Sequence, residues 1–88
     1  MKVLLSIGVE RIGCSDWELI QSLIIMLHEN NEEFLSFRSM NGKTVVTDGN
    51  DEEVLLTIDK WLFSEKVWAV YGEDGEGNFF TFMLPNEY

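Results

Sequence analysis

Apolar and polar residues alternate in blocks along the 88-residue chain, and the clearest blocks lie near its end. Residues 66–71 and 78–84 are rich in aromatic and β-branched side chains, which favour a pleated and half-buried surface. Gly72, Gly75 and Gly77 lie between them and supply the backbone freedom that a turn requires. The pattern predicts a β-hairpin with apolar arms and an acidic tip.

A second hairpin is predicted in the middle of the chain. Residues 34–38 and 43–47 are apolar or β-branched, and the Asn41-Gly42 pair between them is a strong short-range signal for a two-residue hairpin turn. Residues 1–8 are also apolar, but so short a run fits either a strand or the first turn of a helix. This first segment is therefore left open.

Two further segments fit both a helix and a strand. Residues 15–18 have the form of a capping box, in which a serine and a glutamate satisfy free amides at a helix start. A helix from Asp16 has one apolar stripe, although the unbroken apolar run at 23–27 also suits a central strand. Residues 54–62 carry a helical stripe, and their first half equally fits a buried strand. The pattern alone favours a helix in both segments.

These elements define an α+β fold in a single domain spanning residues 1–88. The expected architecture is a single antiparallel sheet of about five strands with two helices packed on it. The expected order is strand, helix, two hairpin strands, helix and two strands. A chain of this length buries roughly 60–65% of its unfolded surface, which suffices for one modest core.

The net charge of −10 is large for 88 residues. Acidic proteins avoid nucleic-acid phosphates and membrane surfaces, and they attract basic partners such as nucleases, DNA-repair enzymes and toxins. We therefore expect no direct nucleic-acid binding and no membrane association. Cys14 is the only cysteine, so an internal disulfide is excluded and a reducing, cytoplasmic location is expected.

Ten of the sixteen acidic residues fall in three clusters at predicted turns or element starts. The clusters are Glu29, Glu32 and Glu33; Asp48, Asp51, Glu52 and Glu53; and Glu73, Asp74 and Glu76. Like charges so close together repel each other, and a purely structural sequence has little reason to gather them. A stripe of carboxylates spaced like phosphates can occupy the DNA groove of a basic enzyme. Acidic residues are, however, also common at exposed turns.

The sequence holds no pattern of catalytic residues. It lacks a serine–histidine–aspartate set, a cysteine/histidine metal spacing, a Walker loop and a dinucleotide-binding glycine pattern. His28 stands alone, and residues 48–53 depart from a calcium loop because Glu53 occupies the position that requires glycine. We expect neither enzymatic activity nor a cofactor nor a metal site.

Three blocks of the sequence resemble the phage uracil-DNA glycosylase inhibitors, a family of small acidic proteins that mimic DNA. They cover about two thirds of the chain. The first block holds Leu19-Ile20-Gln21, Ile24-Ile25-Met26-Leu27, Glu29 and Glu32-Glu33. The second block holds Asp51-Glu52-Glu53-Val54-Leu55-Leu56-Thr57. The third block holds Lys66, Trp68-Ala69, Asp74, Gly77 and Met83-Leu84.

The resemblance implies that a first-strand edge and an acidic helix lie along the DNA-binding cleft of the target enzyme. It also implies a pocket that takes up the apolar side chain which the enzyme otherwise pushes into the duplex. In this chain, Glu33 would belong to the acidic helix and Trp68 to the core. The pocket would be lined by Met26, Phe34 and Leu56.

The sequence differs from the family at two positions and in the expected order of its elements. The first-strand glutamate of the family falls on Ser22, and an acidic helix position falls on Asn30, with Glu18 and Glu29 as candidates to compensate. A member of the family has the order helix, strand, helix and four strands. The resemblance therefore requires strands at 19–27 and 54–58, where the pattern favours helices.

The sequence leads us to expect a small acidic DNA-mimic inhibitor that blocks the DNA-binding site of a nucleic-acid enzyme, with uracil-DNA glycosylase as the first target. Its expected contacts are Glu18 and the three acidic clusters, together with the apolar trio Met26, Phe34 and Leu56. The alternatives are an anti-CRISPR or anti-restriction inhibitor, an immunity protein or antitoxin that neutralises a basic nuclease, and an interaction domain whose charge only provides solubility.

Overall fold

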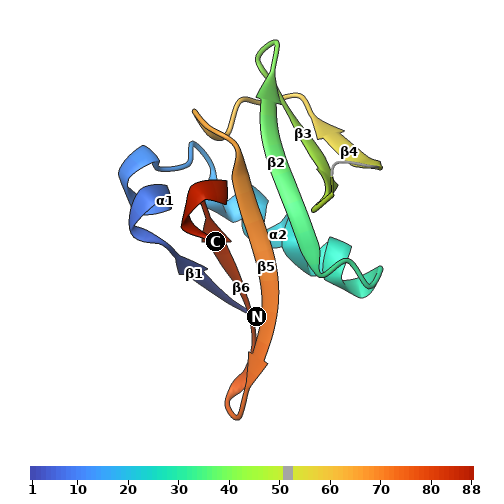
Figure 1. Cartoon of the computed structure of the whole chain (residues 1–88). Coiled ribbons are helices and arrows are strands. Elements are labelled where there is room, and N and C mark those ends of the chain that lie inside the picture. Colours follow the sequence, from blue (N-terminus) through green and yellow to red (C-terminus); the bar gives the residue numbers. More distant parts are fainter. Residues whose placement is uncertain (51–52) are drawn as a thin grey trace.

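The computed structural model describes residues 1–50 and 53–88, which form one sheet with two α-helices (Figure 1). This confirms the α+β class, the single sheet and the two helices. The elements in chain order are β1 (Lys2–Leu5), α1 (Ile7–Ile12), α2 (Trp17–Glu29), β2 (Phe34–Met40), β3 (Lys43–Asp48), β4 (Val54–Ile58), β5 (Val67–Asp74), β6 (Gly77–Met83) and a 3-10 turn, η1 (Pro85–Glu87).

The sheet has six strands in the order β1-β6-β5-β2-β3-β4. Both predicted hairpins are present, as β2–β3 and β5–β6, and Asn41 and Gly42 have the positive φ angles of a two-residue turn (53° and 78°). Five strands pair antiparallel, as predicted. The sixth, β1, pairs parallel to β6, with Val3 beside Phe80, so the sheet is mixed.

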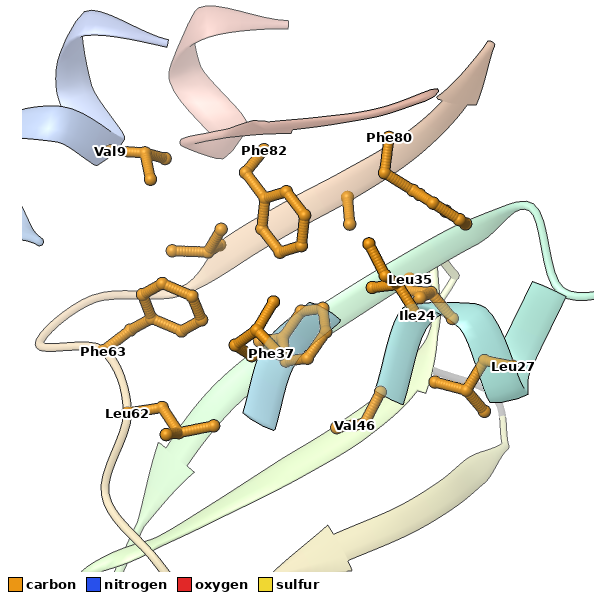
Figure 2. Close-up of a cluster of buried hydrophobic side chains, with 13 residues drawn as sticks. Val9, Ile24, Leu27, Leu35, Phe37, Val46, Leu62, Phe63, Phe80 and Phe82 are labelled. Atoms are coloured by element: carbon orange, nitrogen blue, oxygen red, sulfur yellow. The ribbon is translucent and has the colours of Figure 1, made fainter. Parts of the chain in front are cut away.

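The core lies between one face of the sheet and α2 (Figure 2). The helix contributes Ile20, Ile24 and Leu27, whose spacing places them on one face of the helix. Each fully buried side chain of this kind contributes about 1.5–3 kcal/mol through removal from water. The sheet and the segment after β4 supply Leu35, Phe37, Val46, Leu62, Phe63, Val67, Ala69, Phe80 and Phe82.

The helix predicted from Asp16 is confirmed as α2, but its cap differs from the prediction. A carboxylate oxygen of Asp16 accepts a hydrogen bond from the amide of Leu19 (3.1 Å), so Asp16 is the N-cap. The hydroxyl of Ser15 instead donates to the carbonyl of Trp61 (2.6 Å). The helix therefore starts one residue later than a capping box at Ser15 would place it.

The helix predicted for residues 54–62 is wrong, because Val54–Ile58 form β4. This strand pairs antiparallel with β3, and Val46 lies beside Leu56. The helical interpretation needed Trp61 on a buried stripe, but Trp61 follows the strand and is 47% exposed. The β-branched residues of the segment fit a pleated strand beside β3 instead. A strand here agrees with the resemblance to the inhibitor family.

The other helix, α1, was not predicted from the sequence pattern. Six residues are too few to show a helical period. The hydroxyl of Ser6 accepts a hydrogen bond from the amide of Val9 (3.2 Å), and Gly13 ends the helix with a φ of 69°. The element order is therefore strand, two helices and five strands, and α2 occupies the segment 19–27, where the resemblance requires a strand.

Candidate interaction surface

The three acidic clusters meet at one end of the sheet. Because β2, β3, β4, β5 and β6 pair antiparallel, three connections lie at the same end of the sheet. They are the segment that leads into β2, the β3–β4 turn and the β5–β6 turn. The pairing of Leu35, near the start of β2, with Asp48, the last residue of β3, is consistent with this placement. We call this region the acidic end. Its described carboxylates are those of Glu29, Glu32, Glu33, Asp48, Glu53, Glu73, Asp74 and Glu76. The predicted site residues Asp51 and Glu52 lie outside the described residues.

The other basic side chains lie toward the opposite end of the sheet, which includes the β2–β3 turn and α1. Six carboxylates accompany them, so the side chains there carry a net charge of −1. The basic residues are Arg11, Arg38, Lys43, Lys60 and Lys66. Lys2 is the one basic residue among the described residues of the acidic end, and it forms an ion pair with Glu76. One positive and eight negative side chains give this end a net charge of −7. The negative charge of the protein is therefore concentrated at one end.

The acidic end is stepped, because the β5–β6 hairpin projects beyond the rest of the sheet (Figure 1). The last pair between β2 and β5 joins Phe34 to Val70, and β5 continues for four more residues to Asp74. At about 3.3 Å per residue, this arm extends about 13 Å past β2. We call residues 71–77 the arm. It carries one acidic cluster outward while the other two stay at the base of the step.

The end of α2 is fixed against the base of the arm. The ring of His28 stacks on that of Tyr71, with centroids 4.5 Å apart and planes 17° apart. The amide of Tyr71 donates to the carbonyl of Glu33 (2.8 Å). Burial raises the pKa of Tyr71, and the nearby carboxylates of Glu73 and Glu33 raise it further, against a hydrogen bond with Asn78. Two of the acidic clusters thus act on the same phenol.

The arrangement of charge at the acidic end opposes folding. The C-terminus of a helix carries partial negative charge, and Glu29 is the last residue of α2. An exposed ion pair between Lys2 and Glu76 (3.3 Å) offsets only one carboxylate. Because the carboxylates repel one another and the helix end, stability does not explain their position. A cationic partner would relieve this repulsion.

The expected apolar trio is not brought together. Met26 lies on α2 and is 43% exposed, and Leu56 is half-buried on the side of β4 that carries the core. Phe34 lies on the opposite face of the sheet, where its ring packs against Trp68 (centroids 5.2 Å apart) and Tyr88 (6.4 Å). The part of the chain that the structure describes contains no pocket.

Two other predicted residues, Trp68 and Glu18, have different surroundings from those expected. Trp68 is half-buried beneath Tyr88, outside the core that Phe80 and Phe82 join. Glu18 lies in the first turn of α2 and so belongs to the opposite end. Cys14 is half-buried, and burial is the largest cause that raises the pKa of its thiol. Such a thiol is suited to packing and poorly suited to nucleophilic attack.

Within residues 1–50 and 53–88, no group of three or more histidine, cysteine, aspartate or glutamate side chains is arranged to hold a metal ion. Within the same ranges, no helix is long and apolar enough to cross a membrane. No protein-family model, curated protein or solved structure matches the chain. The charge distribution is therefore the observation from which a function is argued.

Proposed function

We propose that the protein is an inhibitor that binds the cationic DNA-binding surface of a nucleic-acid enzyme and excludes DNA from it. The observation that supports this proposal is the segregation of charge, with −7 on the described side chains of the acidic end and −1 at the opposite end. Duplex DNA presents a dense row of anions, and enzymes that act on it carry complementary lysine and arginine surfaces. The acidic end has the sign and density of charge that such a surface binds.

The scaffold suits this role because several of the carboxylates lie in or next to turns that join paired strands. Glu73 and Asp74 belong to β5, which pairs with β6 up to the turn, so their backbone is held in place before binding. Prior ordering reduces the entropy lost on association. Concentrated charge also speeds the encounter with an oppositely charged surface and makes its rate depend on salt.

Uracil-DNA glycosylase is the first enzyme to test, because the sequence resembles its phage inhibitors in three blocks. The helix at Trp17–Glu29 means that this protein would not use a strand of that segment for the contact. The proposal rests on the acidic end and extends to other enzymes with cationic DNA grooves. These include CRISPR effectors, restriction complexes and basic nuclease toxins.

A charge-reversal experiment tests the proposal. The variant Glu33→Lys/Glu73→Lys reverses two exposed carboxylates of the acidic end, one before β2 and one on the arm. The control variant Glu10→Lys/Glu65→Lys makes the same change in charge at the opposite end. Each is added to uracil-DNA glycosylase with a uracil-containing duplex, and to a panel of a CRISPR effector, a restriction enzyme and a basic nuclease with their substrates. We expect the wild type and the control to inhibit at least one enzyme.

The first variant is expected to inhibit that enzyme at least tenfold less well and with a weaker dependence on salt, because fewer ionic contacts form. Circular dichroism confirms that both variants are folded. If the wild-type protein in excess inhibits no enzyme of the panel, or if both variants inhibit equally, the acidic end is not a DNA-mimicking surface.

A further inference from the structure

Three pairs in the sequence place a glycine directly after an asparagine or an aspartate. They are Asn41-Gly42, Asp48-Gly49 and Asp74-Gly75. At such a pair the backbone nitrogen of the glycine can attack the side-chain carbonyl carbon of the preceding residue, because glycine has no side chain that hinders the approach. The attack closes a five-membered succinimide ring. The three pairs differ in how free the reacting groups are.

The two aspartate pairs are protected by hydrogen bonds. In the pair that begins with Asp48, the nitrogen that would attack belongs to Gly49, and its N–H donates to the carbonyl of Phe34 (2.9 Å). In the other pair, Oδ1 of Asp74 accepts a hydrogen bond from the amide of Glu76 (2.8 Å), which restrains the side chain. An ionised carboxylate is, in addition, a poor electrophile for a neighbouring nitrogen.

At Asn41-Gly42 both reacting groups are free. The pair forms the turn at the tip of the β2–β3 hairpin (Figure 1), and both residues are exposed. Within the described chain, the amide of Gly42 and the side chain of Asn41 make no hydrogen bond. A β-carbon built at Gly42 has no atom within 4 Å, so nothing covers the turn. The carboxamide is uncharged, and its nitrogen can leave as ammonia.

We propose that the Asn41-Gly42 turn is a site of spontaneous deamidation. Water or hydroxide takes the proton of the Gly42 amide, and the nitrogen attacks Cγ of Asn41. The new bond from this nitrogen to Cγ forms as the bond from Cγ to Nδ2 breaks, and Nδ2 leaves as ammonia with a proton from water. A water molecule then opens the ring at either carbonyl, which gives aspartate or isoaspartate at position 41. Asparagine is among the residues that hyperthermophilic proteins avoid because they are thermolabile.

The ring closes only when the backbone between the two residues rotates, so the reaction proceeds from an open turn. Opening needs only the loss of the last pair of the hairpin, Met40 with Lys43, and both side chains are exposed. The next pair, Ser39 with Thr44, is anchored, because the Ser39 hydroxyl donates to the carbonyl of Phe63 (2.5 Å). Such local opening at an exposed tip costs far less than unfolding of the core.

Both products change the protein at the end of the sheet opposite the acidic end. Each adds one negative charge, so the described side chains there carry −2 in place of −1. Isoaspartate also routes the main chain through its side chain and adds one backbone atom to the turn. A two-residue hairpin turn has no room for that atom, so the pair of Met40 with Lys43 is lost. The acidic end is unchanged, and this proposal therefore stands or fails independently of the inhibitory function.

The test is incubation of the purified full chain in mildly alkaline buffer, in parallel with the same chain unfolded in urea. Digestion and mass spectrometry follow the gain in mass at each asparagine, and an isoaspartate-specific methyltransferase detects the rearranged backbone. The five other asparagines serve as internal controls: Asn30, Asn31, Asn50, Asn78 and Asn86. The variant Asn41→Asp supplies the added charge without the added backbone atom.

In the folded chain we expect conversion of Asn41 to be about tenfold faster than that of any other asparagine, because only Asn41 precedes a glycine. The rate should rise with pH, since the attacking nitrogen must lose its proton. Nuclear magnetic resonance should show that the isoaspartate product has lost the pair of Met40 with Lys43 and that Asn41→Asp keeps it. The proposal is overturned if Asn41 stays intact in the folded chain while it is converted in urea. It is also overturned if Asn41 reacts no faster than the other asparagines, or if isoaspartate forms as fast at Asp48 or Asp74.

Discussion

The imidazole of His28 stacks on the phenol ring of Tyr71, with 4.5 Å between the ring centroids. His28 is the last but one residue of α2, and Tyr71 opens the arm of the β5–β6 hairpin. Both rings also pack edge-on against Phe80. This aromatic contact joins the end of the helix to the projecting hairpin, and it positions two acidic clusters relative to each other.

Replacement of His28 tests this contact. Nδ1 of His28 is buried and has no hydrogen-bond partner among the described residues. His28→Phe keeps the ring stack and removes the unpaired polar atom, so we expect a free energy of unfolding equal to that of the wild type or about 0.5–1 kcal/mol higher. His28→Ala removes the stack and should lower it by about 1–2 kcal/mol. Urea unfolding measures both, and equal loss in both variants would show that the stack contributes little.

Charge reversal at the two ends of α2 measures how much the negative charge of the acidic end lowers the free energy of unfolding. Glu29 lies at the C-terminus of the helix and Glu18 in its first turn. Glu29→Lys is expected to raise the free energy of unfolding by about 0.5 kcal/mol, and Glu18→Lys to lower it by a similar amount, because the helix dipole favours cations only at its C-terminus. Thermal unfolding at low and high salt checks this. Both effects should shrink with added salt, and effects of the same sign would contradict the account.

The carboxylate of Glu87 predicts a specific dependence of stability on pH. It accepts hydrogen bonds from the Ser6 hydroxyl (2.6 Å) and from the amides of Leu84 (2.8 Å) and Gly8 (3.0 Å). The Ser6 hydroxyl is the largest cause that holds the pKa of Glu87 below its ordinary value of 4.5. Its contribution to stability is therefore complete above pH 4.5 and is lost as the pH falls through the lowered pKa.

Comparison with Glu87→Gln isolates this contribution from the other carboxylates. The difference in free energy of unfolding between the wild type and Glu87→Gln should be constant above pH 4.5 and shrink below it. Urea unfolding across this range provides the measurement. A difference that stays constant down to strongly acidic pH would show that the hydrogen bonds of Glu87 do not favour its charged form.

Gly49 gives a prediction about the face of the sheet opposite α2. A methyl group added at Gly49 would overlap the ring of Phe34, whereas one added at Gly75 has no atom within 4 Å. Gly49→Ala should lower the free energy of unfolding by about 1–3 kcal/mol, because Phe34 must move away from Trp68 and Tyr88. Gly75→Ala should change it by less than about 1 kcal/mol.

A double-mutant cycle assigns the loss to Phe34. Phe34→Leu is expected to cost less in the Gly49→Ala background than in the wild type, because the ring is already displaced there. Additive effects would show that Gly49→Ala acts through the turn itself and not through the aromatic contact.

Local sequence signals predicted the elements that they encode directly. Asn41-Gly42 has few alternatives to a hairpin turn, and the aromatic alternation after Lys66 allows little besides strands. The apolar run at 54–58 carries no such information, because the same residues satisfy a helical stripe and a strand. Pairing with the preceding strand, β3, decided the outcome. Tertiary contacts therefore overrode the local pattern at β4.

The candidate surface was predicted in composition but not in arrangement. The sequence identifies three acidic clusters, yet only the strand order brings them to one end and sends Glu18 to the other. With residues 54–62 as a helix, the turn that holds Glu53 has no fixed place in the sheet. Phe34 was assigned to a pocket with Met26, but strand alternation turns it to the opposite face. His28 gave no sequence signal for its stack on Tyr71.

The parallel pairing of β1 with β6 has a consequence for how the chain folds. Val3 finds its neighbour, Phe80, only after all the residues between the two have been synthesised. Until β6 has been made, β1 remains an unpaired apolar segment of the nascent chain, because β6 is its only neighbour in the sheet of the described residues. Structures that depend on such distant contacts close late and fold slowly. The first strand thus completes the sheet only when the last strand has been made, so a polypeptide interrupted before β6 cannot form the native fold.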